Sequence, residues 1–126
     1  MKELTNEVLE FLKERRWDNL RPSDLAKSIS IEAAELLELF QWSNLTIDET
    51  KSDPELMTKL RGELADVIIY CLQMSALLDI DATQAVEDKL DKVRAKYPAE
   101  LMRDRSGNEH GGGNAYQEIK KKYREG

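Results

Sequence analysis

Hydrophobic residues recur three and four positions apart along most of this chain, with charged residues between them. That spacing indicates amphipathic helices, because one turn of an α-helix takes about 3.6 residues and brings such positions to one face. No stretch shows the convincing period-two alternation of apolar and polar residues that is typical of a strand. The pattern predicts four helices, over residues 5–16, 22–42, 54–78 and 82–96. Short connections between them favour an all-α fold built as an antiparallel four-helix bundle.

The third predicted helix is expected to lie at the centre of the bundle. Residues 64–72 are apolar on nearly every side, and Cys71 among them is expected to be a small buried core residue. Asp53 can cap this helix, with Pro54 as its first residue. Asp81 and Gln84 resemble a capping box at the start of the next helix.

The composition changes near the carboxyl end of the chain. Residues 106–114 are glycines and polar residues, and three consecutive glycines at 111–113 mark the clearest hinge. Residues 115–126 form a short basic stretch, either a helix or a mobile tail. The expected organisation is one helical domain over residues 1–105, followed by a Gly-rich hinge and a basic tail over residues 106–126.

The formal net charge of −6 argues against a nucleic acid polymer as a partner, because its phosphates would be repelled. A single small anion held by a metal ion and a few cations is still compatible with that charge. No apolar run approaches the roughly 18 to 20 residues that cross a bilayer, and the first residues are acidic where a signal peptide is apolar. We therefore expect a cytoplasmic protein that does not bind membranes. Because a core of this size is modest, we also expect a homo-oligomer, either a dimer or a tetramer.

Acidic residues stand where apolar residues are expected on two of the predicted helices. Glu32 falls in the middle of the apolar stripe of the second predicted helix, and Glu35 flanks that stripe one turn further on. The third predicted helix repeats the arrangement, with Glu63 within its stripe and Asp66 beside it. In an antiparallel bundle the two pairs can meet. Glu38 lies on the polar side, where it is either a solvated residue or an outer or second-metal ligand.

Four carboxylates gathered in an apolar setting must be neutralised, since they repel one another and lose contact with water. Protonation, pairing with Arg or Lys, and a divalent cation are the three routes. Oxygen ligands favour a hard cation, so Mg²⁺ is the first choice, Mn²⁺ the second and Ca²⁺ less suited. His110 is the only histidine, which argues against di-iron and zinc sites. Solvated helix faces also carry acid pairs, as Glu10 and Glu14 illustrate, but two pairs on apolar stripes favour a metal site.

Several segments together resemble the MazG-like members of the all-α NTP pyrophosphohydrolase superfamily, close to the small dCTP pyrophosphatase branch. The resemblance spans about residues 14–98 and includes one Glu-x-x-Glu pair and one Glu-x-x-Asp pair. The segments that carry it are ERRW at 14–17, EAAELLELFQW at 32–42, ELADVIIY at 63–70, KLD at 89–91 and YP at 97–98.

The resemblance implies an enzyme that converts a (d)NTP to the (d)NMP and pyrophosphate and removes unwanted nucleotides. It implies that four acidic residues bind Mg²⁺: Glu32, Glu35, Glu63 and Asp66. Glu38 would assist a second ion or the attacking water. It further implies that aromatic rings line a base pocket, namely Trp17, Trp42 and Tyr70. Lys89 and Arg94 would contact phosphate groups.

Two positions depart from the family pattern. Val93 stands where many relatives carry Asn, and residues 20–22 replace a segment that contains His. Both changes remove possible hydrogen bonds to the base or the sugar, so the substrate within the family stays open. A related superfamily enzyme acting on dUTP or phosphoribosyl-ATP is one alternative. A metal-free helical module that associates with itself or with a partner helix is another.

Overall fold

Helices make up most of the chain that the computed structural model describes, which is residues 1–103 and 113–125. No strand occurs within those two ranges, so the all-α prediction is confirmed. The five longer helices are α1 (Lys2–Glu14), α2 (Pro22–Glu38), α4 (Pro54–Leu77), α5 (Ala82–Lys96) and α7 (Gly113–Glu125). The two short ones are α3 (Ile47–Lys51) and α6 (Ala99–Met102). Within the described ranges, no helix has the length and apolar character needed to span a bilayer.

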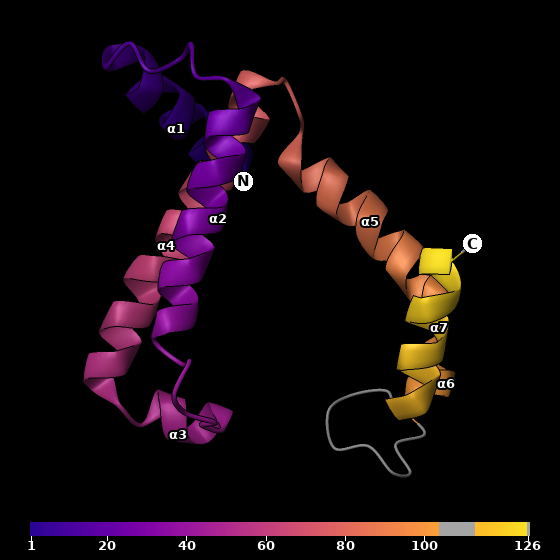
Figure 1. Ribbon diagram of the computed structural model, residues 1–126. Coiled ribbons are helices and arrows are strands. Elements are labelled where there is room, and N and C mark those ends of the chain that lie inside the picture. Colours follow the sequence, from indigo (N-terminus) through magenta and orange to yellow (C-terminus); the bar gives the residue numbers. More distant parts are fainter. Residues whose placement is uncertain (104–112, 126) are drawn as a thin grey trace. The chain divides into compact units, whose positions relative to one another are not determined.

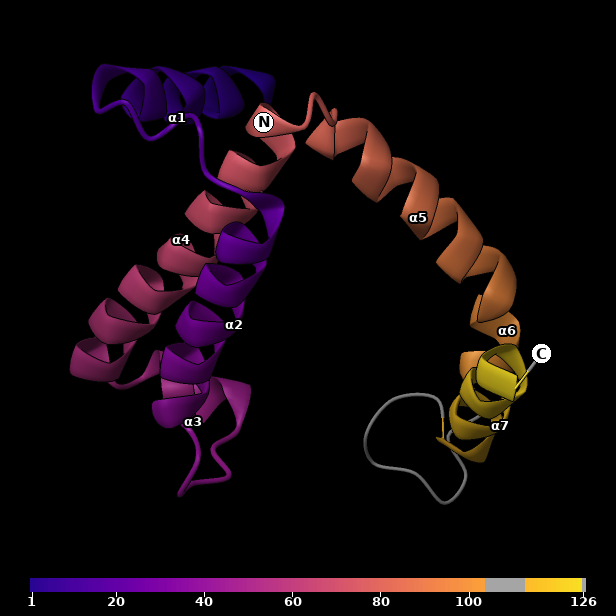
Figure 2. The same cartoon turned by 45° about the horizontal axis from the view of Figure 1, so that its top comes forward.

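Contacts between residues divide the chain into two compact units, Met1–Ala82 and Thr83–Gly126. In the first unit, α2 and α4 lie side by side and run in opposite directions, with α3 between them in the chain (Figure 1; Figure 2). Helix α1 packs against α4. Because α4 contacts α1, α2 and α3, it has the central place in this unit that the sequence predicts.

The core of the first unit is small and lies where α1 meets the carboxyl-terminal half of α4. Val8 and Leu12 of α1 are buried there against Leu72 of α4, and Leu77 packs against this cluster. Leu25 of α2 is also fully buried. The cluster is thus formed by residues far apart in the sequence, and it fixes α1 onto α4.

Part of the apolar surface of α4 is not covered within the single chain. Leu64 is 46% exposed and Ile68 is 41% exposed. Cys71 is exposed as well, so its prediction as a buried core residue was wrong. These three residues recur at i, i+4 and i+7 and therefore share one helix face. Leu72, which follows Ile68 by one turn, is buried by α1.

The predicted helix over residues 22–42 is too long, because α2 ends at Glu38. The backbone N–H groups of Leu39 and Phe40 donate to carbonyls three residues back, at 3.3 Å and 2.9 Å, so the last turn tightens instead of continuing. The short helix α3 was not predicted. Its start is marked by Thr46, whose Oγ1 accepts a hydrogen bond from the Glu49 backbone N–H at 3.1 Å.

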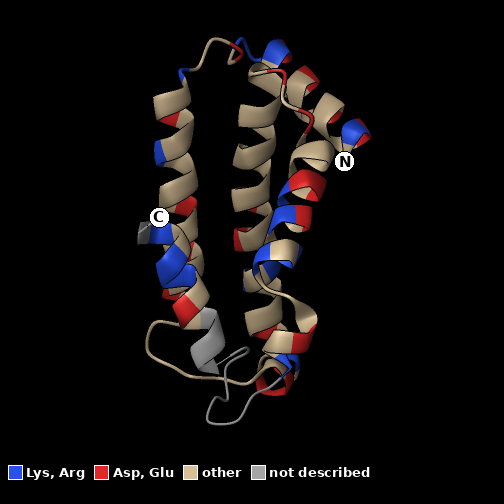
Figure 3. Ribbon diagram, turned by 90° about the vertical axis from the view of Figure 1, so that its right-hand side faces the viewer, with Lys and Arg blue, Asp and Glu red and all other residues tan. Residues whose placement is uncertain are grey.

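The second unit contains α5, α6 and α7, and α6 contacts α7. Of the two possibilities for the basic tail, the structure has the helix, α7. Its last two turns carry a cluster of cations, blue in Figure 3: Lys120, Lys121, Lys122 and Arg124. Residues 106–112, most of the expected hinge, lie outside the described residues.

The predicted cap of α4 is confirmed, and it gives a test of the fold. The Asp53 carboxylate accepts a hydrogen bond from the backbone N–H of Leu56 at 3.1 Å, and Pro54 follows as the first helical residue. We expect Asp53→Ala to lower the free energy of unfolding by about 1 kcal/mol, because a donor of the first turn loses its partner. Urea unfolding followed by circular dichroism measures this, and Asp53→Ser should keep most of the stability. A serine variant as unstable as the alanine variant would contradict the capping role.

Candidate metal centre

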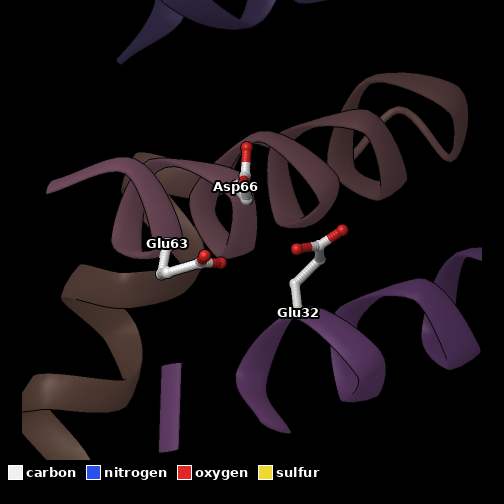
Figure 4. Close-up of side chains that lie close together, drawn as sticks. All are labelled: Glu32, Glu63 and Asp66. Atoms are coloured by element: carbon white, nitrogen blue, oxygen red, sulfur yellow. The ribbon is translucent and has the colours of Figure 1, made fainter. Parts of the chain in front are cut away.

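The packing of α2 on α4 brings together three of the acidic residues that the sequence singles out. Glu32 comes from α2, and Glu63 and Asp66 come from α4, where they are one turn apart. One carboxylate oxygen from each lies within 4.8 Å of the other two. Figure 4 shows the side chains of Glu32 and Glu63 directed into the space between the two helices. Three of the four predicted ligands therefore come together where the two antiparallel helices pack.

This cluster is poorly satisfied by the rest of the protein. Glu32 and Glu63 are half-buried, and the Oε2 atom of each is buried without a hydrogen-bond partner. The ion pairs described in residues 1–103 join other residues: Glu14 with Arg15, Glu55 with Lys59, and Asp91 with Arg94. Neutralisation by Arg or Lys is thus not realised at the cluster, and a buried carboxylate oxygen with no donor is costly.

The pKa values of Glu32 and Glu63 reflect the same crowding of carboxylates. The pKa of Glu32 is raised from its ordinary value by a hydrogen bond with the carboxyl group of Glu35, by loss of solvent, and by the negative charges of Glu35, Asp66 and Glu63. The pKa of Glu63 is raised mainly by loss of solvent, then by the charges of Glu35 and Asp66 and by a hydrogen bond with Glu35. Both acids thus give up their protons less readily than an isolated glutamic acid.

Glu35 and Glu38 surround the three-carboxylate set. Glu35 is half-buried and interacts with both Glu32 and Glu63, as the causes of their pKa shifts show. Glu38 is exposed, and its charge adds to the rise in the pKa of Glu63. Glu38 therefore lies near enough to act on the cluster electrostatically, although the helical projection placed it on the polar side of α2.

The donor set fits a hard divalent cation. The cluster offers carboxylate oxygens only, and oxygen ligands are what Mg²⁺ prefers. A cation there would give the two buried Oε2 atoms the partner that they lack. It would also offset the mutual repulsion that raises the pKa values of Glu32 and Glu63.

The aromatic residues that the resemblance assigns to a base pocket have different surroundings. Trp17 is half exposed and forms an edge contact with Phe11, with ring centroids 6.0 Å apart. Trp42 is 91% exposed, and Tyr70 is half-buried. The ring pairing described in residues 1–103 therefore joins Trp17 to Phe11 and not to Trp42 or Tyr70.

The two cations assigned to phosphate groups both lie on α5, in the second unit. Lys89 is exposed, and Arg94 donates a hydrogen bond to the Asp91 carboxylate at 3.1 Å. Lys92 and Lys96 share a helix face with Lys89.

The fold and the site together define a class of protein. Its members are all-helical, and two of their long antiparallel helices share a cluster of carboxylates. The chain belongs to the MazG-like family, whose model matches residues 27–110. This confirms both the family resemblance and the expected MazG-like helical fold.

The relatives include enzymes from animals and one archaeal structure. The chain is 38% identical over 96 residues to dCTP pyrophosphatase 1 of Mus musculus, covering 75% of this chain and 56% of that protein. The corresponding protein of Homo sapiens is 36% identical over 99 residues, with 77% of this chain and 58% of that protein covered. The chain thus spans a little over half the length of these curated relatives. The crystal structure of a pyrophosphatase from Archaeoglobus fulgidus DSM 4304 matches with a TM-score of 0.68 and 39% identity, covering 78% of this chain and 92% of the other.

The raised pKa values of Glu32 and Glu63 predict how the stability of the folded protein changes with pH. Because the folded-state pKa values of Glu32 and Glu63 lie above the ordinary 4.5, the folded protein takes up protons more readily than the unfolded chain. The resulting stabilisation is fully present below that ordinary value and is lost as the pH rises through the raised values. Glu63→Gln is neutral at every pH. In EDTA we therefore expect its stability relative to the parent protein to increase between about pH 5 and about pH 8.

Urea unfolding at the two pH values measures this difference. The exposed Glu10 of α1 provides the control, since Glu10→Gln should show no comparable increase. A stability advantage of Glu63→Gln that shrinks as the pH rises would contradict the crowding of carboxylates.

Proposed function

We propose that this chain is a Mg²⁺-dependent hydrolase that converts (d)NTPs to (d)NMPs and pyrophosphate. The observation that carries the proposal is the meeting of Glu32, Glu63 and Asp66, with two buried oxygens that have no hydrogen-bond partner. The names of the relatives support the reaction class, since they are a dCTP pyrophosphatase and a pyrophosphatase. Removal of unwanted nucleotides is the role that fits such an activity.

Glu32, Glu35, Glu63 and Asp66 are the residues proposed to hold the metal, with Mn²⁺ as a possible substitute for Mg²⁺. When bound, Mg²⁺ supplies neutralising charge for phosphate oxygens and makes a water molecule a better nucleophile. The protein contributes rigid placement, because the ligands come from two long helices that pack directly on each other. Partial burial of Glu32 and Glu63 strengthens their electrostatic interactions by limiting contact with water.

The remaining residues are proposed to bind and orient the substrate. Glu38, which is exposed and lies near the cluster, is proposed to accept the proton of the attacking water. Stacking of the base is assigned to Trp17, Trp42 and Tyr70, because flat rings can stack on a nucleobase. Phosphate contact is assigned to Lys89 and Arg94 on α5. These assignments follow the family motif.

A dCTP-like substrate is proposed as the preferred one, with dUTP and phosphoribosyl-ATP as the alternatives within the superfamily. Incubation with each candidate and Mg²⁺, followed by separation of the products, decides among them. Pyrophosphate must appear together with the monophosphate, and release of orthophosphate would refute the reaction.

Replacement of single cluster residues tests the metal centre directly. We expect Glu32→Gln and Glu63→Gln each to reduce kcat/KM for the best substrate by on the order of 100-fold or more, because each removes a charged ligand. Glu10→Gln, which removes a negative charge from an exposed position on α1, should keep full activity. Turnover that survives both cluster substitutions would favour the metal-free helical module instead.

We also propose that the chain forms a homo-oligomer in which a second copy covers the exposed face of α4. Leu64, Ile68 and Cys71 form a continuous stripe on this face, and Cys71 adds a small side chain to two large apolar ones. Among the described residues, only Val8, Leu12, Leu25 and Leu72 form the buried hydrophobic core. A chain with so few buried apolar residues gains stability by covering such a stripe. A second copy can do so by placing the same stripe against this one.

The oligomer is tested by placing a charge within that stripe. We expect Ile68→Glu to shift the protein to a smaller species, because the carboxylate would be buried against an apolar partner face. Sedimentation velocity measures the change, and circular dichroism confirms retained helicity. Lys59→Glu, on the exposed amino-terminal part of α4, should leave the size unchanged. If the Ile68→Glu variant sediments like the parent protein, the stripe is not the interface.

A further inference from the structure

The chain reverses direction directly after α1, and this turn places Trp17 (Figure 2). Arg16 has a φ of 58°, in the left-handed region that glycine adopts more readily. The backbone N–H of Arg16 donates to the Lys13 carbonyl at 3.1 Å, and that of Trp17 donates to the Leu12 carbonyl at 2.8 Å. This is the Schellman pattern of helix ends, in which the residue after the left-handed one commonly contacts an apolar side chain of the last turns. The turn therefore directs Trp17 back onto α1.

Phe11 is the aromatic side chain that Trp17 contacts there. The two ring centroids lie 6.0 Å apart at an interplanar angle of 68°, which is an edge contact. The guanidinium carbon of Arg15 lies over the Phe11 ring, 3.9 Å from its centroid. Arg15 also donates hydrogen bonds to the Phe11 carbonyl at 3.2 Å and to the Glu14 carboxylate at 3.5 Å. Phe11 is thus restrained by Arg15 and contacts the indole ring of Trp17.

These ring contacts are separate from the core that fixes α1 onto α4. The α1 side chains in that core are Val8 and Leu12, whereas Phe11 is 39% exposed. Phe11 also precedes the segments that carry the family resemblance, which begin at residue 14. Replacing its ring with an aliphatic side chain should therefore disturb Trp17 more than the packing of α1 on α4.

Trp17 is half exposed even though it contacts Phe11. An exposed side chain loses conformational freedom when a ligand packs on it, and this loss weakens binding unless the side chain is already ordered. We propose that Phe11 is a positioning residue, which keeps the indole ring of Trp17 in the orientation that receives a nucleobase. This inference rests on the proposed function, in which Trp17 stacks on the base.

Substrate kinetics test the positioning role. We expect Phe11→Leu to raise KM for the best nucleotide substrate about fivefold and to change kcat by less than about twofold, because the cost of ordering Trp17 affects binding. Phe11→Tyr keeps an aromatic ring and should keep the parent KM. In a Trp17→Ala background, Phe11→Leu should have no further effect on KM, since the two residues act through one contact.

Fluorescence gives a second measurement that does not depend on catalysis. Trp42→Phe leaves Trp17 as the only tryptophan of the chain, so time-resolved anisotropy then reports the motion of its ring. In that background we expect Phe11→Leu to increase the amplitude of nanosecond and faster depolarisation about twofold or more, because the indole ring is released. Phe11→Tyr should leave the amplitude unchanged. Circular dichroism checks that each variant keeps its helices.

Several results would overturn the inference. These are unchanged depolarisation in the Phe11→Leu variant, an unchanged KM in that variant, and an equal rise in KM with and without the Trp17 indole. If Trp17→Ala leaves KM unchanged, the inference is also wrong, although the proposed hydrolysis would stand. If no nucleotide yields pyrophosphate, the proposed function fails, whereas the anisotropy still decides whether Phe11 orders Trp17.

Discussion

Carboxylates packed between two helices are the constraint on which the first unit depends. Glu32 on α2 and Glu63 on α4 occupy positions where apolar side chains would bind the helices together more tightly. Each instead contributes a buried oxygen without a hydrogen-bond donor, and the pKa of each is raised by its neighbours. Such destabilising positions are typical of functional sites, where binding of a ligand offsets the loss of folding stability.

Helix α4 carries the acids of the cluster and its contacts with α1 on different sides. The face toward α2 carries Glu63, and the face toward α1 carries Leu72, which is buried with Val8 and Leu12. The small cluster beside α1 therefore holds the helix whose other side carries the acids. Ile68, one turn before Leu72 and about 40° from it around the helix, is left exposed. Glu63 and Leu72 are about 180° apart, so a change on one of these two sides can leave the other intact.

Much of this was predictable from the sequence because it depends on local rules. The longer helices follow from apolar periodicity, the start of α4 from Asp53 and Pro54, and the meeting of the acid pairs from their place on apolar stripes. Helix α3 was not predicted, because five residues are too few to show the helical period of apolar residues. Only the capping residue Thr46 indicates where it starts.

The errors concern what lies next to a residue rather than the helix that contains it. Cys71 sits in an apolar run, yet its burial depends on which face of α4 another element covers, and periodicity does not specify that. The contact between Trp17 and Phe11 and the effect of Glu38 on Glu63 are also settled by tertiary packing. The sequence thus predicted which carboxylates come together better than it predicted their surroundings.

A cluster of carboxylates cannot attract a polyphosphate by itself, since both are negative. Any affinity of this acidic chain for such a ligand has to come from cations, either a bound metal or lysine and arginine side chains placed for the purpose. On α5, the Asp88 carboxylate accepts a hydrogen bond from Gln84 and Asp91 pairs with Arg94, while Lys89 and Lys92 belong to none of the ion pairs described in residues 1–103. A cation of this kind can interact with a polyphosphate locally, because neighbouring carboxylates do not neutralise it, even though the net charge of the chain opposes such an interaction.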